Sequence, residues 1–131
     1  QVTHPRFIKD IDSGIISADI TKESPEKVKP YLKYIDYLFI SEDDLFMEIE
    51  QLGSLTKGWV ISHSPSRSIY SNGKKTVIYN IPKDLILSNI NVLGAGDYFA
   101  SGFINSIILG YDMHSSIMEA HKHTTEILNN N

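Results

Sequence analysis

The sequence predicts an α/β fold with a parallel sheet and helices on both of its faces, and three observations support this prediction. Short apolar runs of strand length alternate with segments of helical pattern. An Asn-Gly pair between two β-rich runs predicts one hairpin. The 131 residues suffice for one domain with a modest core. In such a fold, ligands are expected at the carboxyl ends of the parallel strands.

The first part of the chain predicts a strand followed by a short helix. Gly14 to Ile20 is mostly apolar and β-rich, which is typical of a buried strand. Thr21 to Pro25 is a polar loop with a proline. Glu26 to Tyr34 then has helical spacing and is expected to pack through three apolar side chains: Val28, Leu32 and Ile35.

The next segment repeats this strand-and-helix order. Tyr37 to Ile40 is a continuous apolar run, which predicts a strand buried on both faces. Ser41 is a natural N-cap for a helix over Glu42 to Leu52, whose first turn is acidic. Gly53 predicts the C-terminal stop of that helix.

The second half of the chain predicts a strand, a hairpin and two helices. Trp59 to Ser62 is a further buried-strand candidate. The runs Ser68 to Ser71 and Lys75 to Tyr79 flank Asn72-Gly73, a sequence that favours a tight hairpin turn. The two predicted helices follow a connection over residues 81–90 and cover Ala95 to Leu109, ending at Gly110, and Ser115 to Leu128.

Composition excludes several classes of function. The formal net charge of −4 argues against nucleic-acid binding, which favours basic surfaces. The longest apolar-rich run, Phe99 to Leu109, is shorter than the ~20 residues that span a bilayer. There is no cysteine, so disulfides and thiolate metal sites are excluded, which fits a reducing cytosol. We therefore expect a cytoplasmic protein that acts on a small molecule.

The most informative motif is Gly94-Ala95-Gly96-Asp97, directly before an apolar helical run. Glycines allow the backbone to approach a ligand closely, and the amides at a helix N-terminus favour an anion. A carboxylate beside such a site would repel a phosphate, but it suits a base that deprotonates a hydroxyl attacking that phosphate. The motif therefore predicts phosphoryl transfer.

The stretch from Asn91 to Phe99, with Ser101-Gly102-Phe103 after it, resembles the signature of the ribokinase-like (PfkB) carbohydrate kinases. That signature reads D-T-x-G-A-G-D-x-F, followed by a small residue, Gly and Phe. Residues 34–41 are similar to the family strand that ends in N-x-x-E, and residues 60–64 to the strand that ends in T-x-G-x-x-G. The stretch Ser17 to Leu32 looks nearest to the fructosamine-type members, such as fructoselysine 6-kinases.

This resemblance covers residues 14–128 and corresponds to the C-terminal half of a family member. It implies that residues 1–131 form the nucleotide- and phosphate-binding part of a ribokinase-like α/β/α sandwich, without the N-terminal half that carries the lid and most sugar contacts. Because the chain also begins at Gln1 rather than Met, we expect a fragment or a processed product. We also expect this chain to pair with the missing half or to form a homodimer, since apolar sheet surface would otherwise be exposed.

The resemblance implies an ATP-dependent kinase for a sugar or sugar-derivative hydroxyl, with Mg²⁺ on the ATP. Asp97 matches the general base, and the amides of Gly94, Ala95 and Gly96 match the anion hole for the transferred phosphoryl group. An alternative interpretation of Asp97 is an acidic residue that stabilises the first turn of a helix.

Further residues correspond to the family's nucleotide and metal positions. Asp44 lies at the Glu of N-x-x-E and Ser41 at its Asn, where they would hold the Mg²⁺ water shell; capping of a helix is the equal alternative. For the nucleotide, the resemblance implies contacts by Ser62, Ser64 and Arg67, and a place at the adenine edge for His121. A packed or exposed helix histidine is as plausible for His121.

Departures from the family pattern leave two other interpretations open. Ser64 and Arg67 replace both glycines of T-x-G-x-x-G, and Asn91 replaces an Asp. These changes favour a diverged or truncated relative that binds nucleotide or sugar phosphate without turnover. A small receiver-like or flavodoxin-like binding module is the third possibility, although it leaves Gly94–Asp97 unexplained.

Overall fold

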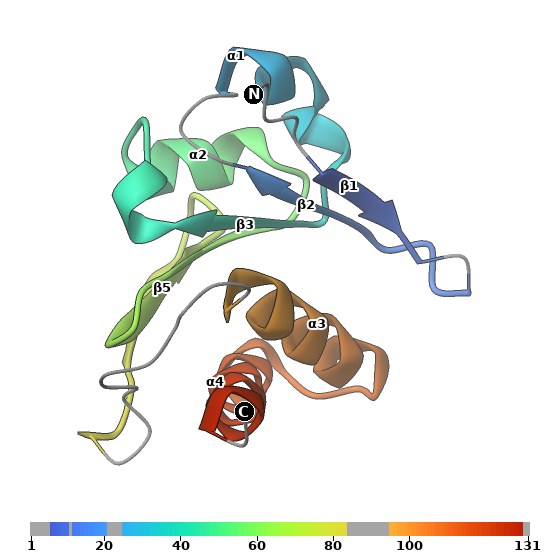
Figure 1. The fold of residues 1–131 in the computed structure, drawn as a ribbon. Coiled ribbons are helices and arrows are strands. Elements are labelled where there is room, and N and C mark those ends of the chain that lie inside the picture. The colour runs from blue at the N-terminus through green and yellow to red at the C-terminus, as the bar shows by residue number, and fades with distance from the viewer. Residues whose placement is uncertain (1–5, 11, 21–24, 84–94, 130–131) are drawn as a thin grey trace, which may run out of the picture. The chain divides into compact units, whose positions relative to one another are not determined.

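A computed structural model describes residues 6–10, 12–20, 25–83 and 95–129 (Figure 1). The chain folds into two compact units. Unit 1 comprises residues 1–64 and 69–78, and unit 2 comprises residues 65–68 and 79–131. The two units are described separately below.

The described residues form a six-stranded sheet in which the spatial order of the strands follows the chain. Its strands are β1 (Arg6–Lys9), β2 (Ile16–Ile20), β3 (Tyr37–Ser41), β4 (Trp59–His63), β5 (Arg67–Ser71) and β6 (Thr76–Asn80). Strands β2, β3 and β4 are parallel, as the sequence predicts, whereas β1 pairs antiparallel with β2. The predicted α/β fold with parallel strands and a hairpin is therefore confirmed, and the antiparallel edge strand β1 makes the sheet mixed.

Strand β1 lies at the edge of the sheet and was not predicted. Two of its four residues, Arg6 and Lys9, are cationic, so it lacks the apolar pattern of a buried strand. A short turn connects β1 to β2, in which Gly14 has a φ of 75° and its amide donates to the Asp10 carbonyl. So short a connection joins only antiparallel neighbours.

Two crossover connections carry the short helices of unit 1. Between β2 and β3 lie α1 (Pro25–Val28) and the 3₁₀ helix η1 (Lys29–Tyr34). Between β3 and β4 lie the 3₁₀ helix η2 (Glu42–Asp44) and α2 (Ile49–Leu55). When right-handed crossovers connect successive parallel strands in the same direction across a sheet, their helices lie on the same face of that sheet. All of these helices do lie on the same side of β2 and β3 (Figure 1).

The core of unit 1 fills the space between these helices and the sheet. On the strands, the members of this core cluster all have even numbers: Ala18, Ile20, Leu38, Ile40 and Val60. The odd-numbered Phe39 and Ile61 are just as buried. Side chains alternate between the faces of a strand, so odd-numbered residues lie on the opposite face. From the helical segments, the predicted residues Val28, Leu32 and Ile35 all join the core.

The predicted helix over Glu42–Leu52 is instead broken into two pieces. After η2, residues 45–48 are not helical, and α2 begins at Ile49. Leu45, Phe46 and Met47 are consecutive apolar residues that pack against the core, an arrangement that a helix with one buried stripe does not allow. The Ser41 side chain makes no capping hydrogen bond. Gly53 lies inside α2 and does not end it.

Strands β5 and β6 form the predicted hairpin, joined by residues 72–75. Gly73 has a φ of 90°, and the Asn72 amide donates to the Lys75 carbonyl over 3.2 Å. This loop lies directly against α2. A Cβ on Gly73 would come within 2.7 Å of the Cα of Ser54, and a Cβ on Gly53 within 2.7 Å of the Ser71 carbonyl oxygen. Two glycines therefore let the hairpin and the helix meet backbone to backbone.

The helices of unit 2 are α3 (Ala95–Ile108) and α4 (Met113–Asn129), which pack against each other. Gly110, with a φ of 97°, ends α3 as predicted. The Asp112 carboxylate accepts from the Ser115 amide at 2.7 Å and caps α4, so that helix starts slightly earlier than expected. Gly102 lets the helices approach, since a Cβ there would lie 3.1 Å from the His123 ring. No helix among the described residues has both the length and the hydropathy to span a bilayer.

Candidate nucleotide and phosphate site

The predicted site residues of unit 1 gather at the carboxyl ends of β3 and β4. Ser41 is the last residue of β3 and is paired in register with His63, the last residue of β4. Ile40 and Ser62 form the preceding pair. The sequence thus correctly predicts that the segments beginning at Ser41 and Ser62 leave the sheet at the same edge. This is the edge at which α/β proteins bind ligands.

Ser62 and His63 lie on opposite faces of β4. Ser62 is on the same face as the core residue Val60, has no exposed surface, and donates its hydroxyl to the Ile69 carbonyl oxygen over 3.2 Å. His63 is on the other face, beside Ser41. The Ser62 side chain therefore helps to hold β5 against β4, while Ser41 and His63 share the other face at this edge.

His63 was not among the predicted site residues, although it directly follows one of them. Burial lowers the pKa of its imidazole from 6.5 to about 4, so the ring is neutral at physiological pH. No sequence signal distinguishes it, because only the register of β3 and β4 shows that it faces the same way as Ser41.

Two further predicted residues of unit 1, Asp44 and Ser64, follow these strand ends. Asp44 ends η2, three residues after Ser41, and is partly exposed. Ser64 follows β4 directly and is partly buried. Arg67, also partly buried, is the first residue of β5 and belongs to unit 2.

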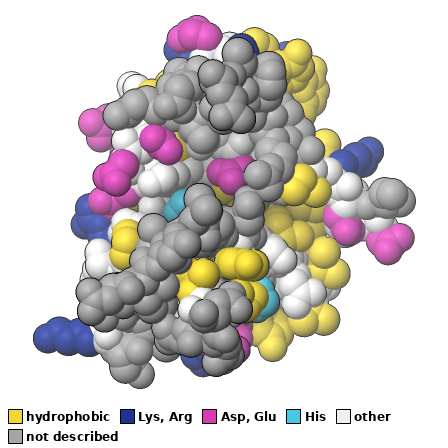
Figure 2. Space-filling model, in the orientation of Figure 1, with side chains coloured by type: hydrophobic (Ala, Val, Ile, Leu, Met, Phe, Trp, Pro, Cys, Tyr) yellow, Lys and Arg dark blue, Asp and Glu magenta, His cyan; other side chains and the backbone are white. Residues whose placement is uncertain are grey.

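Acidic residues dominate the segment after β3. Glu42, Asp43 and Asp44 make up the whole of η2, and Figure 2 shows acidic side chains (magenta) among those exposed on one face of the molecule. Among the described residues, no cluster of three or more His, Asp or Glu side chains could hold a metal ion unaided. Mg²⁺ commonly binds through one or two carboxylates plus substrate phosphates, and a role of Asp44 at such an ion stays a prediction.

In unit 2, the predicted anion hole falls at the start of α3. Gly94 lies outside the described residues, and α3 begins with Ala95, Gly96 and Asp97. The first amides of a helix have no partner within it. Amides at helix starts commonly bind anions, and the anion hole at Gly94, Ala95 and Gly96 stays a prediction. Asp97 lies in the first turn, as predicted.

His121 is buried in unit 2 within an aromatic cluster, which we define as Tyr79, Phe99, His114 and His121. Ser68 is hydrogen bonded to this cluster. The Nε2 of His121 lies 2.7 Å from the Ser68 hydroxyl oxygen in a buried hydrogen bond. Its ring stacks on Tyr79 with centroids 5.6 Å apart and lies 4.7 Å from the Phe99 ring. Burial raises the pKa of Tyr79. This environment matches the packed-histidine alternative and leaves the adenine role a prediction.

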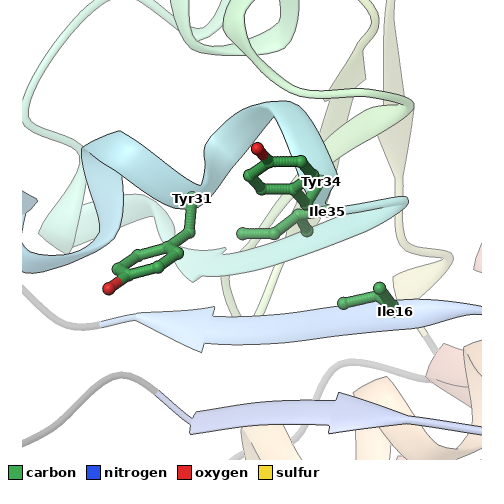
Figure 3. Close-up of a pocket in the computed structure, with 4 residues that line it drawn as sticks. All are labelled: Ile16, Tyr31, Tyr34 and Ile35. Carbon is green, nitrogen blue, oxygen red and sulfur yellow. The ribbon is translucent and has the colours of Figure 1, made fainter.

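A separate apolar pocket of about 400 Å³ lies in unit 1, at the amino-terminal end of β2 (Figure 3). Its lining is Ile16, Tyr31, Tyr34 and Ile35. Tyr31 and Tyr34 are about half exposed, and the Lys33 ammonium lies 5.2 Å from the Tyr34 ring centroid. The described lining residues carry no carboxylate, imidazole or cation, the groups that phosphate chemistry needs.

Comparisons with known proteins give one consistent result. No protein-family model and no curated protein sequence matches this chain. Solved structures do match. An Escherichia coli protein assigned as ribokinase II, in its apo form, has a TM-score of 0.71 and 19% identity, over 92% of this chain and 44% of its own.

Two nucleoside-phosphorylating enzymes also match. The Methanocaldococcus jannaschii nucleoside kinase, an archaeal ribokinase-family member, has a TM-score of 0.68 and 17% identity, over 88% of this chain and 42% of its own. The Schistosoma mansoni adenosine kinase bound to 2-fluoroadenosine has a TM-score of 0.65 and 22% identity, over 79% of this chain and 37% of its own.

These likenesses establish the fold and single out no particular member. The chain spans about two fifths of the length of the structures that it matches. The sheet also differs from the flavodoxin-like alternative, whose strands are all parallel in the order 2-1-3-4-5. Here the order is sequential, and β1 is antiparallel to its neighbour. The described part of the chain therefore has part of the ribokinase-like kinase fold.

Proposed function

We propose that this chain is the nucleotide- and phosphate-binding part of a phosphotransferase that moves the γ-phosphoryl group of ATP to a hydroxyl of a sugar or sugar derivative. The observation that carries the proposal is the start of α3 at Ala95, within Gly94–Asp97, in a chain with part of the ribokinase-like fold. The first amides of a helix can bind a phosphate group, and a neighbouring carboxylate can deprotonate the hydroxyl that attacks this phosphate.

Each predicted residue has a role in this proposal. Asp97 accepts the proton of the attacking hydroxyl, and the amides of Gly94, Ala95 and Gly96 hold the charge that develops on the phosphoryl group. Mg²⁺ bound to ATP would supply charge neutralisation between the β- and γ-phosphates, and Asp44 and Ser41 would hold its water shell. The nucleotide would be bordered by four further residues: Ser62, Ser64, Arg67 and His121.

The test is a phosphoryl-transfer assay on the purified protein with Mg²⁺-ATP and a panel of sugars, fructosamines and nucleosides. Asp97→Asn should lower kcat by about 10²- to 10⁴-fold, because the general base is lost, while the Kd for ATP stays within a few-fold. Asp12→Asn is the matched control, since it makes the same charge change at an exposed position in the β1–β2 turn. Equal turnover of the Asp97→Asn and native proteins would exclude Asp97 as the base.

A second function, nucleotide binding without catalysis, is favoured by the departures from the family pattern at Ser64, Arg67 and Asn91. It predicts ATP binding with no transfer to any acceptor in the panel. The intact mass of the purified protein separates the cases further. A mass about twice the 14.8 kDa of this chain favours a complete kinase, in which the remainder supplies the acceptor site.

A further inference from the structure

We infer that His63, together with Ser41, contacts the phosphate groups of the bound nucleotide, and that the Ser62 hydroxyl does not. This assignment rests on the proposed function, because it names a side chain at the same strand edge. It departs from the sequence resemblance, which places the ligand-facing hydroxyl of this strand at Ser62.

The first support is the register of β3 and β4. Ser41 and His63 are paired residues at the last positions of two adjacent parallel strands. Adjacent strands lie about 4.8 Å apart, and paired residues of parallel strands point to the same face. A hydroxyl and an imidazole therefore stand side by side at the edge where α/β sheets bind ligands.

The second support is the orientation of Ser62. Its neighbours on the same face, Val60 on β4 and Ile40 on β3, belong to the apolar core. Its hydroxyl has no exposed surface and is used by the Ile69 carbonyl. Contact with a ligand would require breaking this hydrogen bond and opening the core, at a free-energy cost that a ligand hydrogen bond does not recover.

The third support is the chemistry of the neighbourhood. The acidic residues of η2 follow Ser41 directly, so a bare phosphate would be repelled there. A serine hydroxyl and an imidazole N–H can both donate to phosphate oxygens, and Mg²⁺ on the phosphates would lessen their repulsion by η2. The site should consequently prefer Mg²⁺-bound di- and triphosphates to ligands without a phosphate chain.

Calorimetric titration of the purified protein with MgATP, MgADP, AMP and adenosine tests the assignment. His63→Leu keeps the volume but removes the donor, so affinity for MgATP and MgADP should fall about tenfold or more, with adenosine affinity unchanged. His63→Gln keeps an amide donor and should recover part of the loss. The control is Gln51→Leu, which exchanges a polar side chain for leucine at an exposed position of α2.

A spectroscopic readout covers the case in which a variant folds poorly. The protein has five histidines, so the ring signals of His63 can be assigned by their loss in His63→Gln. MgADP should shift these signals, whereas adenosine should leave them in place. If neither His63 variant changes MgATP affinity and the ring signals do not move, the assignment is wrong while the proposed function stands.

Two other outcomes also overturn it. A weaker MgATP affinity in Ser62→Ala, with His63→Leu unchanged, would return the contact to Ser62. If the native protein binds none of the four ligands, both the proposed function and the assignment fail.

Discussion

The two units place their polar side chains differently, and two histidines illustrate the contrast. In unit 1 the core is apolar, and the polar residues Ser41 and His63 lie where strands end. In unit 2, polar groups of α4 are buried, where His121 is hydrogen bonded to Ser68 of β5 and Thr124 to the Ala120 carbonyl. The polar residues of unit 1 lie at the edge where α/β sheets bind ligands, whereas those of unit 2 hold buried parts of the fold together.

The largest effect should come from the core of unit 2. Phe103 has no exposed surface, so Phe103→Ala should lower the free energy of unfolding by about 3–5 kcal/mol. The single Trp59 lies in unit 1, 5.7 Å from the Tyr70 ring, and its fluorescence reports on that unit. We expect helical circular dichroism to be lost at lower urea than the Trp59 signal changes. Coincident midpoints would show that the units unfold together.

The next effect concerns acid stability in unit 1. The folded pKa of His63 lies near 4, below the unfolded value of 6.5, so the unfolded state binds more protons as pH falls between them. The contribution of His63 to the free energy of unfolding is therefore fully present above pH 6.5. It is lost as the pH falls toward 4, by about 2–3 kcal/mol. Urea unfolding followed by Trp59 at neutral and acidic pH should show this loss, and His63→Gln should lack most of it. An equal loss in His63→Gln would assign the acid sensitivity to other groups.

A smaller effect is expected where unit 2 buries its polar pair. Ser68→Ala leaves the His121 Nε2 without its hydrogen-bond partner in a buried site, which should cost about 2 kcal/mol of unfolding free energy. Ser101→Ala on the exposed side of α3 is the control and should be neutral or slightly stabilising. Equal stability of both variants would mean that water replaces the Ser68 hydroxyl.

Much of the fold could be predicted because local patterns and packing agree. The apolar run 37–40, the Asn72-Gly73 turn and the Gly110 stop each specify one local structure. The exceptions have tertiary causes. Strand β1 carries charged residues and is defined only by its pairing with β2, and the apolar residues 45–47 leave the helical pattern in order to pack on the core.

The candidate site could be predicted only in part. Motif spacing correctly placed Ser41 and Ser62 at one edge of the sheet, because parallel strands end together. It could not show which face each side chain takes, since a shift of one residue in register reverses that face. The contact between Ser68 and His121 spans 53 positions in the chain and has no local signal.

The backbone contact between α2 and the β5–β6 hairpin has a consequence for how this sequence can vary in length. Hairpin tips usually tolerate added residues, because they project into solvent. Here Gly73 packs on Ser54 and Gly53 on the Ser71 carbonyl, without room for a methyl group at either glycine. An inserted residue or a peptide tag in loop 72–75 would push the helix off the hairpin. The turn at Gly14 has no such backbone contact, since a Cβ there would meet no atom within 4 Å.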